Sequence, residues 1–299
     1  MSKIQEALRE LQEFRQQAGS NGKHTEARFQ GAEQSVQPLI PDPRTKRTRF
    51  DGPKHAVNLD ELIESGLLPA PEHAAQIEDE FRLIKRPLIE NATISFGIEG
   101  HQTNVIMIAS AMPGSGKSFC SVNLASSIAI ERELNVLLVD ADVAKPHIST
   151  ALDLGNRPGL TDILEDSTIP IENALIRCDL NDIQVLPAGR RHLHSTELLA
   201  SERMTRVITE LATRYPDRII VMDSPPLLAT SEAQALAQKV GQIVLVVEYG
   251  ATQHAQIREC LNVLDESKPI NVILNKCLHA RSGGYYGGRY GQYGIDRDQ

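Results

Sequence analysis

Short apolar, β-branched runs alternate with longer segments of helical spacing along most of this chain. The runs expected to form strands are residues 104–110, 135–140, 182–188, 218–223, 242–248 and 271–275. Strands that are apolar throughout are covered on both faces, and strands separated by helices usually pair in parallel. The sequence therefore predicts an α/β fold with a doubly wound, mostly parallel sheet, whose ligand lies at the carboxyl ends of the strands.

A glycine-rich segment, "AMPGSGKS", follows the first of these runs directly and leads into a helical stretch. In a strand-loop-helix unit of this kind, glycines let successive N–H groups face a polyphosphate, and the helix N-terminus adds partial positive charge. Lys117 is expected to reach the β and γ phosphates, and the Ser118 hydroxyl to ligate Mg²⁺. Ala111 replaces the first glycine of the usual pattern, but the flanking elements still predict a P-loop NTPase. The predicted nucleotide-binding residues are Gly114, Ser115, Gly116, Lys117, Ser118 and Phe119.

Acidic residues end two other predicted strands. Asp140 and Asp142 close "VLLVDAD", and Asp223 closes "IIVMD". Beside an ATP–Mg²⁺ complex, one carboxylate can hold the metal while another orients or deprotonates an attacking hydroxyl. Asp223 is the expected metal partner. For Asp140 or Asp142 alone, capping of the next segment is the alternative.

Four of the six tyrosines gather in "GGYYGGRYGQYG", residues 283–294. A segment so rich in glycine cannot build a hydrophobic core. The sequence therefore predicts a disordered tail whose tyrosine side chains stay accessible. The alternative is an adhesive low-complexity segment without a catalytic role. The four tyrosines are Tyr285, Tyr286, Tyr290 and Tyr293.

Composition excludes some classes of function. A net charge of -8 without a concentrated basic surface argues against a dedicated nucleic-acid binder. No apolar run is long enough to span a bilayer, and the first residues lack the apolar segment of a signal peptide. The cysteines show no metal-binding or disulfide spacing and are predicted to be small core residues of a reduced, cytoplasmic protein: Cys120, Cys178, Cys260 and Cys277.

The predicted organisation has four parts. Residues 1–17 form an amphipathic helix, expected to dock on a partner or else to be solvated. Residues 18–57 are a flexible linker, 58–280 the P-loop domain and 281–299 the tyrosine-rich tail. A second amphipathic helix over 77–92 places Phe81, Ile84 and Leu88 on one face, and Pro87 predicts a kink or break in it.

The motifs "AMPGSGKS", "VLLVDADVAKP" and "IIVMDSPP", with the tyrosine-rich end, resemble the bacterial protein-tyrosine kinases of polysaccharide export. The resemblance covers most of the chain from residue 76 onward. "EFRLIKRPLIENA", together with the lack of a spanning segment, resembles the exosortase-associated tyrosine autokinases. The resemblance implies ATP-dependent autophosphorylation of the tail tyrosines and regulation of exopolysaccharide polymerisation and export. It also implies a cytoplasmic protein recruited peripherally to the inner membrane.

The resemblance further implies roles for single residues. Lys117 and Ser118 would bind phosphate and Mg²⁺, Asp142 and Asp223 would support the metal, and Asp140 would be the base. Asn275, in "VILNK", matches the position that contacts adenine. The implied partners are further copies of the chain, in an oligomer or ring, a membrane chain-length determinant or polysaccharide co-polymerase as activator, and a tyrosine phosphatase.

The chain departs from the family pattern at several positions. Lys145 stands where arginine is usual, and His194-Ser195 where Asn-Pro is usual. The oligomerisation motif E-x-x-R-x-x-R finds its best register in Asp79, Arg82 and Lys85, with Arg86 adjacent.

A non-kinase ATPase switch, docking on a membrane partner, is the alternative function. The Min- and Par-type partition ATPases share these motifs but carry a lysine where this chain has Met112. That difference favours the kinase.

Overall fold

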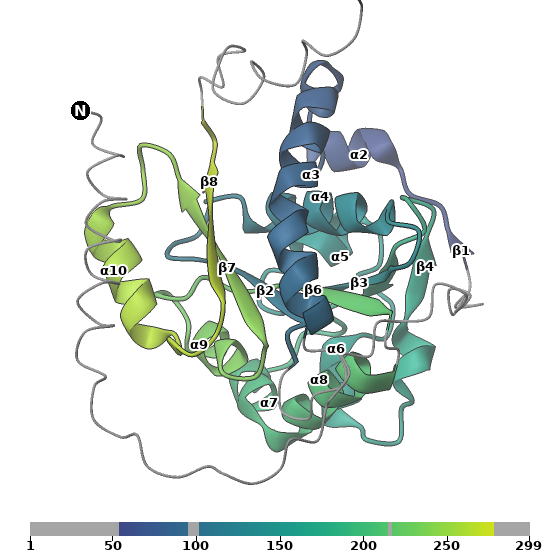
Figure 1. Cartoon of the computed structure of the whole chain (residues 1–299). Coiled ribbons are helices and arrows are strands. Elements are labelled where there is room, and N and C mark those ends of the chain that lie inside the picture. The colour runs from purple at the N-terminus through teal and green to yellow at the C-terminus, as the bar shows by residue number, and fades with distance from the viewer. Residues whose placement is uncertain (1–53, 95–101, 215–216, 278–299) are drawn as a thin grey trace, which may run out of the picture. The chain divides into compact units, whose positions relative to one another are not determined.

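The computed structural model describes residues 54–94, 102–214 and 217–277. At its centre is an eight-stranded sheet in the order β1-β4-β5-β3-β6-β2-β7-β8 (Figure 1). Neighbouring strands pair in parallel except β4 and β5, which are antiparallel. The predicted doubly wound, mostly parallel sheet is thereby confirmed. The strands are β1 (Lys54–His55), β2 (Val105–Ser110), β3 (Asn135–Asp140), β4 (Ile176–Cys178), β5 (Gln184–Leu186), β6 (Arg218–Asp223), β7 (Gln242–Glu248) and β8 (Ile270–Asn275).

Each of the six predicted runs overlaps a strand, whereas β1 and β4 were not predicted. β2 and β6 are buried along their whole length, as expected of central strands covered on both faces. β1 and β4 have two and three residues, too few to show a period. Lys54 and His55 fall within the predicted linker. Because they pair with β4, the prediction of a linker is wrong for these two residues.

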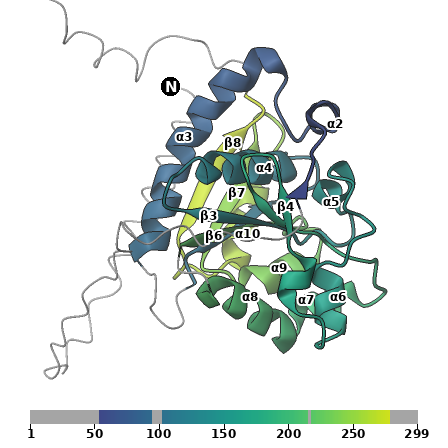
Figure 2. The ribbon, with the colours of Figure 1, turned by 90° about the vertical axis from the view of Figure 1, so that its right-hand side faces the viewer.

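Helices cover both faces of the sheet (Figure 2). One face packs against α2, α3, α4 and α5, and the other against α6 to α10, giving two hydrophobic cores separated by the strands. The helices are α2 (Leu59–Glu64), α3 (Pro71–Ile94), α4 (Lys117–Ala129), α5 (His147–Ala151), α6 (Leu160–Glu165), the 3-10 turn η1 (Ile171–Ala174), α7 (Ser195–Ala200), α8 (Glu202–Arg214), α9 (Ser231–Ala237) and α10 (His254–Val263). Within the described ranges, no helix combines the length and apolar character that crossing a bilayer requires.

α3 corrects the prediction at Pro87. The helix runs unbroken from Pro71 to Ile94 with Pro87 inside it, so a helix break is wrong. Phe81 and Leu88 are buried in the hydrophobic core on this side of the sheet, and Ile84 is partly buried against it. Pro87 is on the exposed side of the helix.

Lys85 of α3 contacts α4 of its own chain. Its Nζ donates to the carbonyl oxygen of Ser127 at 2.7 Å and lies 2.6 Å from a carboxylate oxygen of Glu131. The side chain is buried against α4, and the oligomerisation register stays a prediction. Asp79 and Arg82 are exposed and pair with each other at 3.0 Å.

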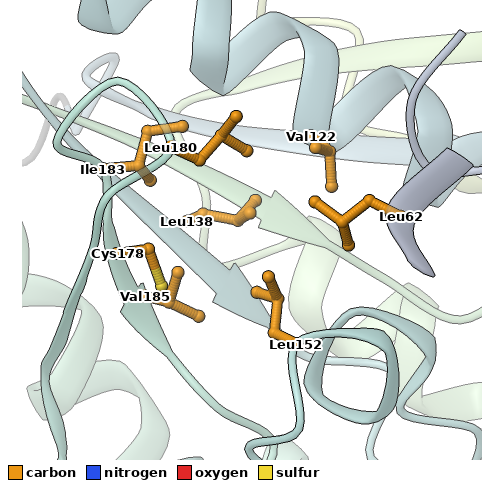
Figure 3. A pocket seen from close by; sticks show the side chains of 8 residues that line it. All are labelled: Leu62, Val122, Leu138, Leu152, Cys178, Leu180, Ile183 and Val185. Carbon is orange, nitrogen blue, oxygen red and sulfur yellow. The ribbon is translucent and has the colours of Figure 1, made fainter. Parts of the chain in front are cut away.

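A small apolar cavity lies between α2, α4, α5 and the β3–β5 side of the sheet (Figure 3). It is a packing gap, because no charged or hydrogen-bonding side chain lines it to orient a ligand. The lining residues are Leu62, Val122, Leu138, Leu152, Cys178, Leu180, Ile183 and Val185. Cys178 is buried, as are Cys120 and Cys260; Cys277 is exposed, so its predicted place in the core is wrong.

Candidate active site

The P-loop connects β2 to α4, as the motif predicts. Gly114 and Gly116 have φ of +87° and +89°, a left-handed backbone that glycine adopts without steric cost. α4 begins at Lys117, and its N-cap, Gly116, offers no side chain to bond the first-turn N–H groups. Those donors, with the helix dipole, fit a polyphosphate.

Asn275 brings the end of β8 onto the P-loop. Its side-chain Nδ2 donates to the carbonyl oxygen of Ser115 at 2.9 Å. The same amide lies against Gly116, in the space that a Cβ at this residue would occupy. The sequence expectation that Asn275 lies at the nucleotide site is consistent with this contact, which joins residues 160 positions apart.

Ser118 and Asp223, both expected around Mg²⁺, are in contact. The Ser118 hydroxyl donates to Asp223 Oδ2 at 2.6 Å, and the Ser121 hydroxyl donates to Oδ1 at 3.0 Å. Burial raises the pKa of Asp223 to about 6, while Ser118, Lys117 and Ser121 act in the opposite direction. Hydroxyl and carboxylate oxygens are ligands that Mg²⁺ prefers, so the pair fits a magnesium ion.

Asp140 pairs in register with Asp223 across β3 and β6 and is fully buried. Its Oδ2 accepts two hydrogen bonds from Ser149, from the backbone N–H at 2.8 Å and the hydroxyl at 2.6 Å. Its Oδ1 is buried and has no hydrogen-bond partner in the described part of the chain. Burial, and after it the charge of Asp223, raise the pKa of Asp140 to about 7. This carboxyl group can therefore exchange a proton near neutral pH.

Asp142 lies further out, beyond the end of β3. It accepts a hydrogen bond from the Lys145 N–H at 3.1 Å. Partial burial raises the pKa of Asp142, and the charges of Lys117 and Lys145 lower it. Asp140 and Asp142 each accept a hydrogen bond from a backbone N–H of the following segment, as the capping alternative expects. Capping does not account for the buried Oδ1 of Asp140, which has no hydrogen-bond partner among the described residues.

Phe119 and the four tail tyrosines differ from the other predicted site residues. The Phe119 ring packs edge-on against Phe81 of α3, with centroids 6.2 Å apart, and is partly buried against the core. Its backbone lies in the first turn of α4, and its contact with a nucleotide stays a prediction. Tyr285, Tyr286, Tyr290 and Tyr293 lie outside the described residues.

Sequence reasoning missed Ser121, Ser149 and Glu232. Ser121 follows Ser118 by three residues and so shares its helix face, a signal that was present. Glu232 of α9 accepts a hydrogen bond from Thr196 at 2.5 Å and adds to the raised pKa of Asp142. Nothing in the local sequence marks Ser149 or Glu232.

Comparison with known proteins agrees with this geometry. A family model described as an AAA domain matches residues 103–274. Tyrosine-protein kinase YwqD of Bacillus subtilis is 32% identical over 229 residues, which cover 75% of this chain and 92% of YwqD. The chain belongs to the bacterial tyrosine-protein kinases.

Two further comparisons support membership of this kinase family. Succinoglycan biosynthesis transport protein ExoP of Rhizobium meliloti is 33% identical over 215 residues, or 67% of this chain, which spans only 26% of ExoP. The crystal structure of the VpsO kinase domain is 28% identical with a TM-score of 0.56, covering 70% of this chain and all of that domain (100%). The predicted family resemblance and the P-loop kinase fold are confirmed.

Proposed function

We propose that this bacterial tyrosine kinase transfers the γ-phosphoryl group of ATP to tyrosines of its own C-terminal segment. The observation that carries the proposal is the buried Asp140, whose Oδ1 has no hydrogen-bond partner in the described residues and whose neighbour in register, Asp223, bonds the P-loop Ser118. The proposed acceptors are Tyr285, Tyr286, Tyr290 and Tyr293.

The P-loop residues hold the nucleotide in this proposal. First-turn N–H groups of α4 and the ammonium group of Lys117 bind the phosphates, and Asn275 contacts the adenine from the end of β8. Ser118, Asp142 and Asp223 would hold Mg²⁺. When bound, Mg²⁺ offsets the charge of the phosphate oxygens and helps to orient them.

In the reaction, the phenolic oxygen of a tyrosine forms a bond to the γ-phosphorus while the bond to the β,γ-bridging oxygen breaks and ADP leaves. The phenolic proton passes to Oδ1 of Asp140. A free phenol has a pKa of about 10, so it arrives protonated and loses its proton only as the new bond forms. The pKa of Asp140, raised by burial to about 7, suits a group that accepts this proton and then releases it to solvent.

We place this kinase in exopolysaccharide polymerisation and export. ExoP, with which the chain shares a third of its residues over the matched region, is named a biosynthesis transport protein. The proposed activator is a membrane chain-length determinant or co-polymerase that recruits the kinase from the cytoplasm to the inner membrane, and a tyrosine phosphatase would reverse the reaction. The exosortase-associated subgroup remains the predicted assignment.

Assembly into a homo-oligomer, and into a ring in particular, is part of the proposal. Asp79 and Arg82 are exposed on α3 and can meet a second copy, whereas Lys85 is held against α4.

The decisive experiment measures the transfer of radiolabelled phosphate from γ-labelled ATP to the purified full-length chain. We expect wild-type protein to become labelled, and Lys117→Met and a variant with all four tail tyrosines changed to Phe to remain unlabelled. Tyr249→Phe is the matched control, because Tyr249 is exposed near the end of β7 but lies outside the tail. It should label like wild type.

Persistent label in the four-tyrosine variant would contradict self-phosphorylation of the tail. Hydrolysis of ATP without any transfer to protein would favour the ATPase switch instead. Mass spectrometry of the labelled protein then identifies which tyrosines carry phosphate.

A further inference from the structure

Ser149 belongs to none of the nucleotide-binding motifs, yet among the described residues it donates both of the hydrogen bonds that the Asp140 carboxylate accepts. It lies in α5, nine residues beyond Asp140, and is almost completely buried. Both its backbone N–H and its hydroxyl donate to the same oxygen, Asp140 Oδ2, at 2.8 and 2.6 Å. Ser149 thus donates both hydrogen bonds to Oδ2 of the Asp140 carboxylate and none to Oδ1.

A third hydrogen bond fixes the direction of the Ser149 hydroxyl. The backbone N–H of Ala188, just past β5, donates to Ser149 Oγ at 2.9 Å. Because a serine hydroxyl carries a single hydrogen, and Oγ accepts from Ala188, that hydrogen is directed to Asp140. Two donors then converge on Oδ2, so Oδ1 is the carboxylate oxygen left to take up a proton.

Ala188 is itself held firmly, which makes it a rigid anchor for Ser149. Its carbonyl oxygen accepts a hydrogen bond from the backbone N–H of Thr161 at 3.0 Å, and the Thr161 hydroxyl lies 3.0 Å from the same oxygen and 2.7 Å from the carbonyl oxygen of Arg190. Asp162 accepts from the N–H of Arg190, two residues further on, at 3.1 Å. The carboxylate of Asp140 is therefore fixed to the carboxyl end of β5 as well as to its own strand, β3.

We propose that Ser149 is a positioning residue of the phosphotransfer reaction, which holds the Asp140 carboxylate in one orientation and leaves Oδ1 to accept the tyrosine proton. This inference rests on the proposed role of Asp140 as base. The reaction itself is the one proposed above. The phenolic oxygen bonds to the γ-phosphorus, ADP leaves, and the phenolic proton goes to Oδ1 of Asp140. Ser149 exchanges no proton and contacts no substrate.

The test compares Ser149→Ala and Ser149→Thr with Thr150→Ala as the matched control. Thr150 is the next residue of α5, and among the described residues its hydroxyl bonds only the carbonyl oxygen of Pro146, at 2.6 Å. In single-turnover self-phosphorylation we expect Ser149→Ala to slow transfer by about tenfold or more, since a well-placed base contributes roughly 10² to 10⁴. The KM for ATP should stay within about twofold, because no phosphate contact is lost. Ser149→Thr, which keeps the hydroxyl, should recover most of the rate, and Thr150→Ala should behave as wild type.

Combining Ser149→Ala with Asp140→Asn separates positioning from general loss of structure. If Ser149 acts through Asp140, Ser149→Ala should not slow the Asp140→Asn enzyme further. Rate losses that multiply, a KM for ATP that rises with the loss of rate, or a wild-type rate in Ser149→Ala would each overturn the inference. A wild-type rate in Asp140→Asn would instead overturn the proposed base, and with it the proposed mechanism.

Should Ser149→Ala fail to fold, Ser149→Cys takes its place, because it keeps the volume and weakens the donor. Melting temperatures of all variants show whether a lost rate merely follows lost stability.

Discussion

Gly114 and Gly116 share a left-handed backbone but differ in their surroundings. A Cβ at Gly114 would meet no atom within 4 Å, whereas at Gly116 it would collide with the amide of Asn275. Both alanine variants incur backbone strain of about 1 to 3 kcal/mol. Only Gly116→Ala must also displace Asn275 and break its bond to Ser115.

We therefore expect Gly116→Ala to weaken ATP binding more than Gly114→Ala, as measured by calorimetric titration. The difference should shrink in an Asn275→Ala background, where the collision is gone. If the two glycine variants still differ as much there, Asn275 is not the cause.

At Asp140, burial has a consequence for stability as well as for catalysis. Because its folded-state pKa is about 7, above that of an unfolded aspartate, the folded protein keeps a proton between about pH 4 and pH 7 that the unfolded chain releases. The stability of the nucleotide-free protein thus falls as pH rises through this window, and the full loss is present above the folded pKa.

Asp140→Asn removes the loss of stability that ionisation of Asp140 causes. The asparagine keeps a side-chain oxygen that can accept the two hydrogen bonds from Ser149. At pH 8 we expect the melting temperature of the variant to exceed that of the wild type by more than about 4 °C. In domains of this size, each kcal/mol of stability typically shifts the melting temperature by about 2 to 4 °C. Melting curves from pH 5 to pH 8 should show the gap widening with pH. A gap that stays constant would indicate a cause other than the ionisation of Asp140.

At the scale of elements, Lys85 attaches α3 to α4 beside the ring contact between Phe81 and Phe119. Lys85→Met keeps the apolar stem but removes the charge that bonds Ser127 and Glu131. Because Glu131 is half exposed and can be hydrated, we expect a loss of about 2 kcal/mol, less than for a fully buried pair. Arg82→Ala, at an exposed pair on the same helix, should cost less than about 1 kcal/mol. Denaturant unfolding measures both, and equal losses would contradict the distinction.

The same helix shows what a pattern of residues can and cannot predict. Apolar spacing placed Phe81 and Leu88 in the core correctly, because burial of apolar surface governs such positions. It could not place Lys85, since a lysine follows its apolar stem inward whenever partners for its charge exist at the end of the pocket. The pattern did not predict β1 and β4, because strands of two and three residues are too short to show a period.

In the whole molecule, the order of strands was not predictable, yet it is what assembles the site. The motifs alone indicated that Ser118, Asp140 and Asp223 would meet, since the ends of parallel strands share one edge of the sheet. The contact between Asn275 and Ser115 requires β8 to lie beside β7, and the Ser149 network requires α5 to fold back under β3. Neither follows from local sequence.

Phosphorylation is expected to act on assembly. Each phosphate adds about -1.5 to -2 charges at neutral pH, and several on one short segment repel one another and any acidic neighbour. We predict that phosphorylated protein forms smaller oligomers than the variant with four tail tyrosines changed to Phe, as measured by light scattering after size exclusion. Phosphatase treatment should restore the larger mass. Equal masses throughout would contradict the prediction.

The contact of β8 with the P-loop also bears on how the kinase selects its substrate. Tyr285 follows Asn275 by ten residues, a length that spans at most about 35 Å when extended. A segment tethered so closely is presented to nearby active sites at an effective concentration on the order of millimolar. The enzyme then needs little affinity for the sequence around a tyrosine, and a free peptide must reach comparable concentrations to compete. Selectivity for self would arise from covalent attachment rather than from recognition.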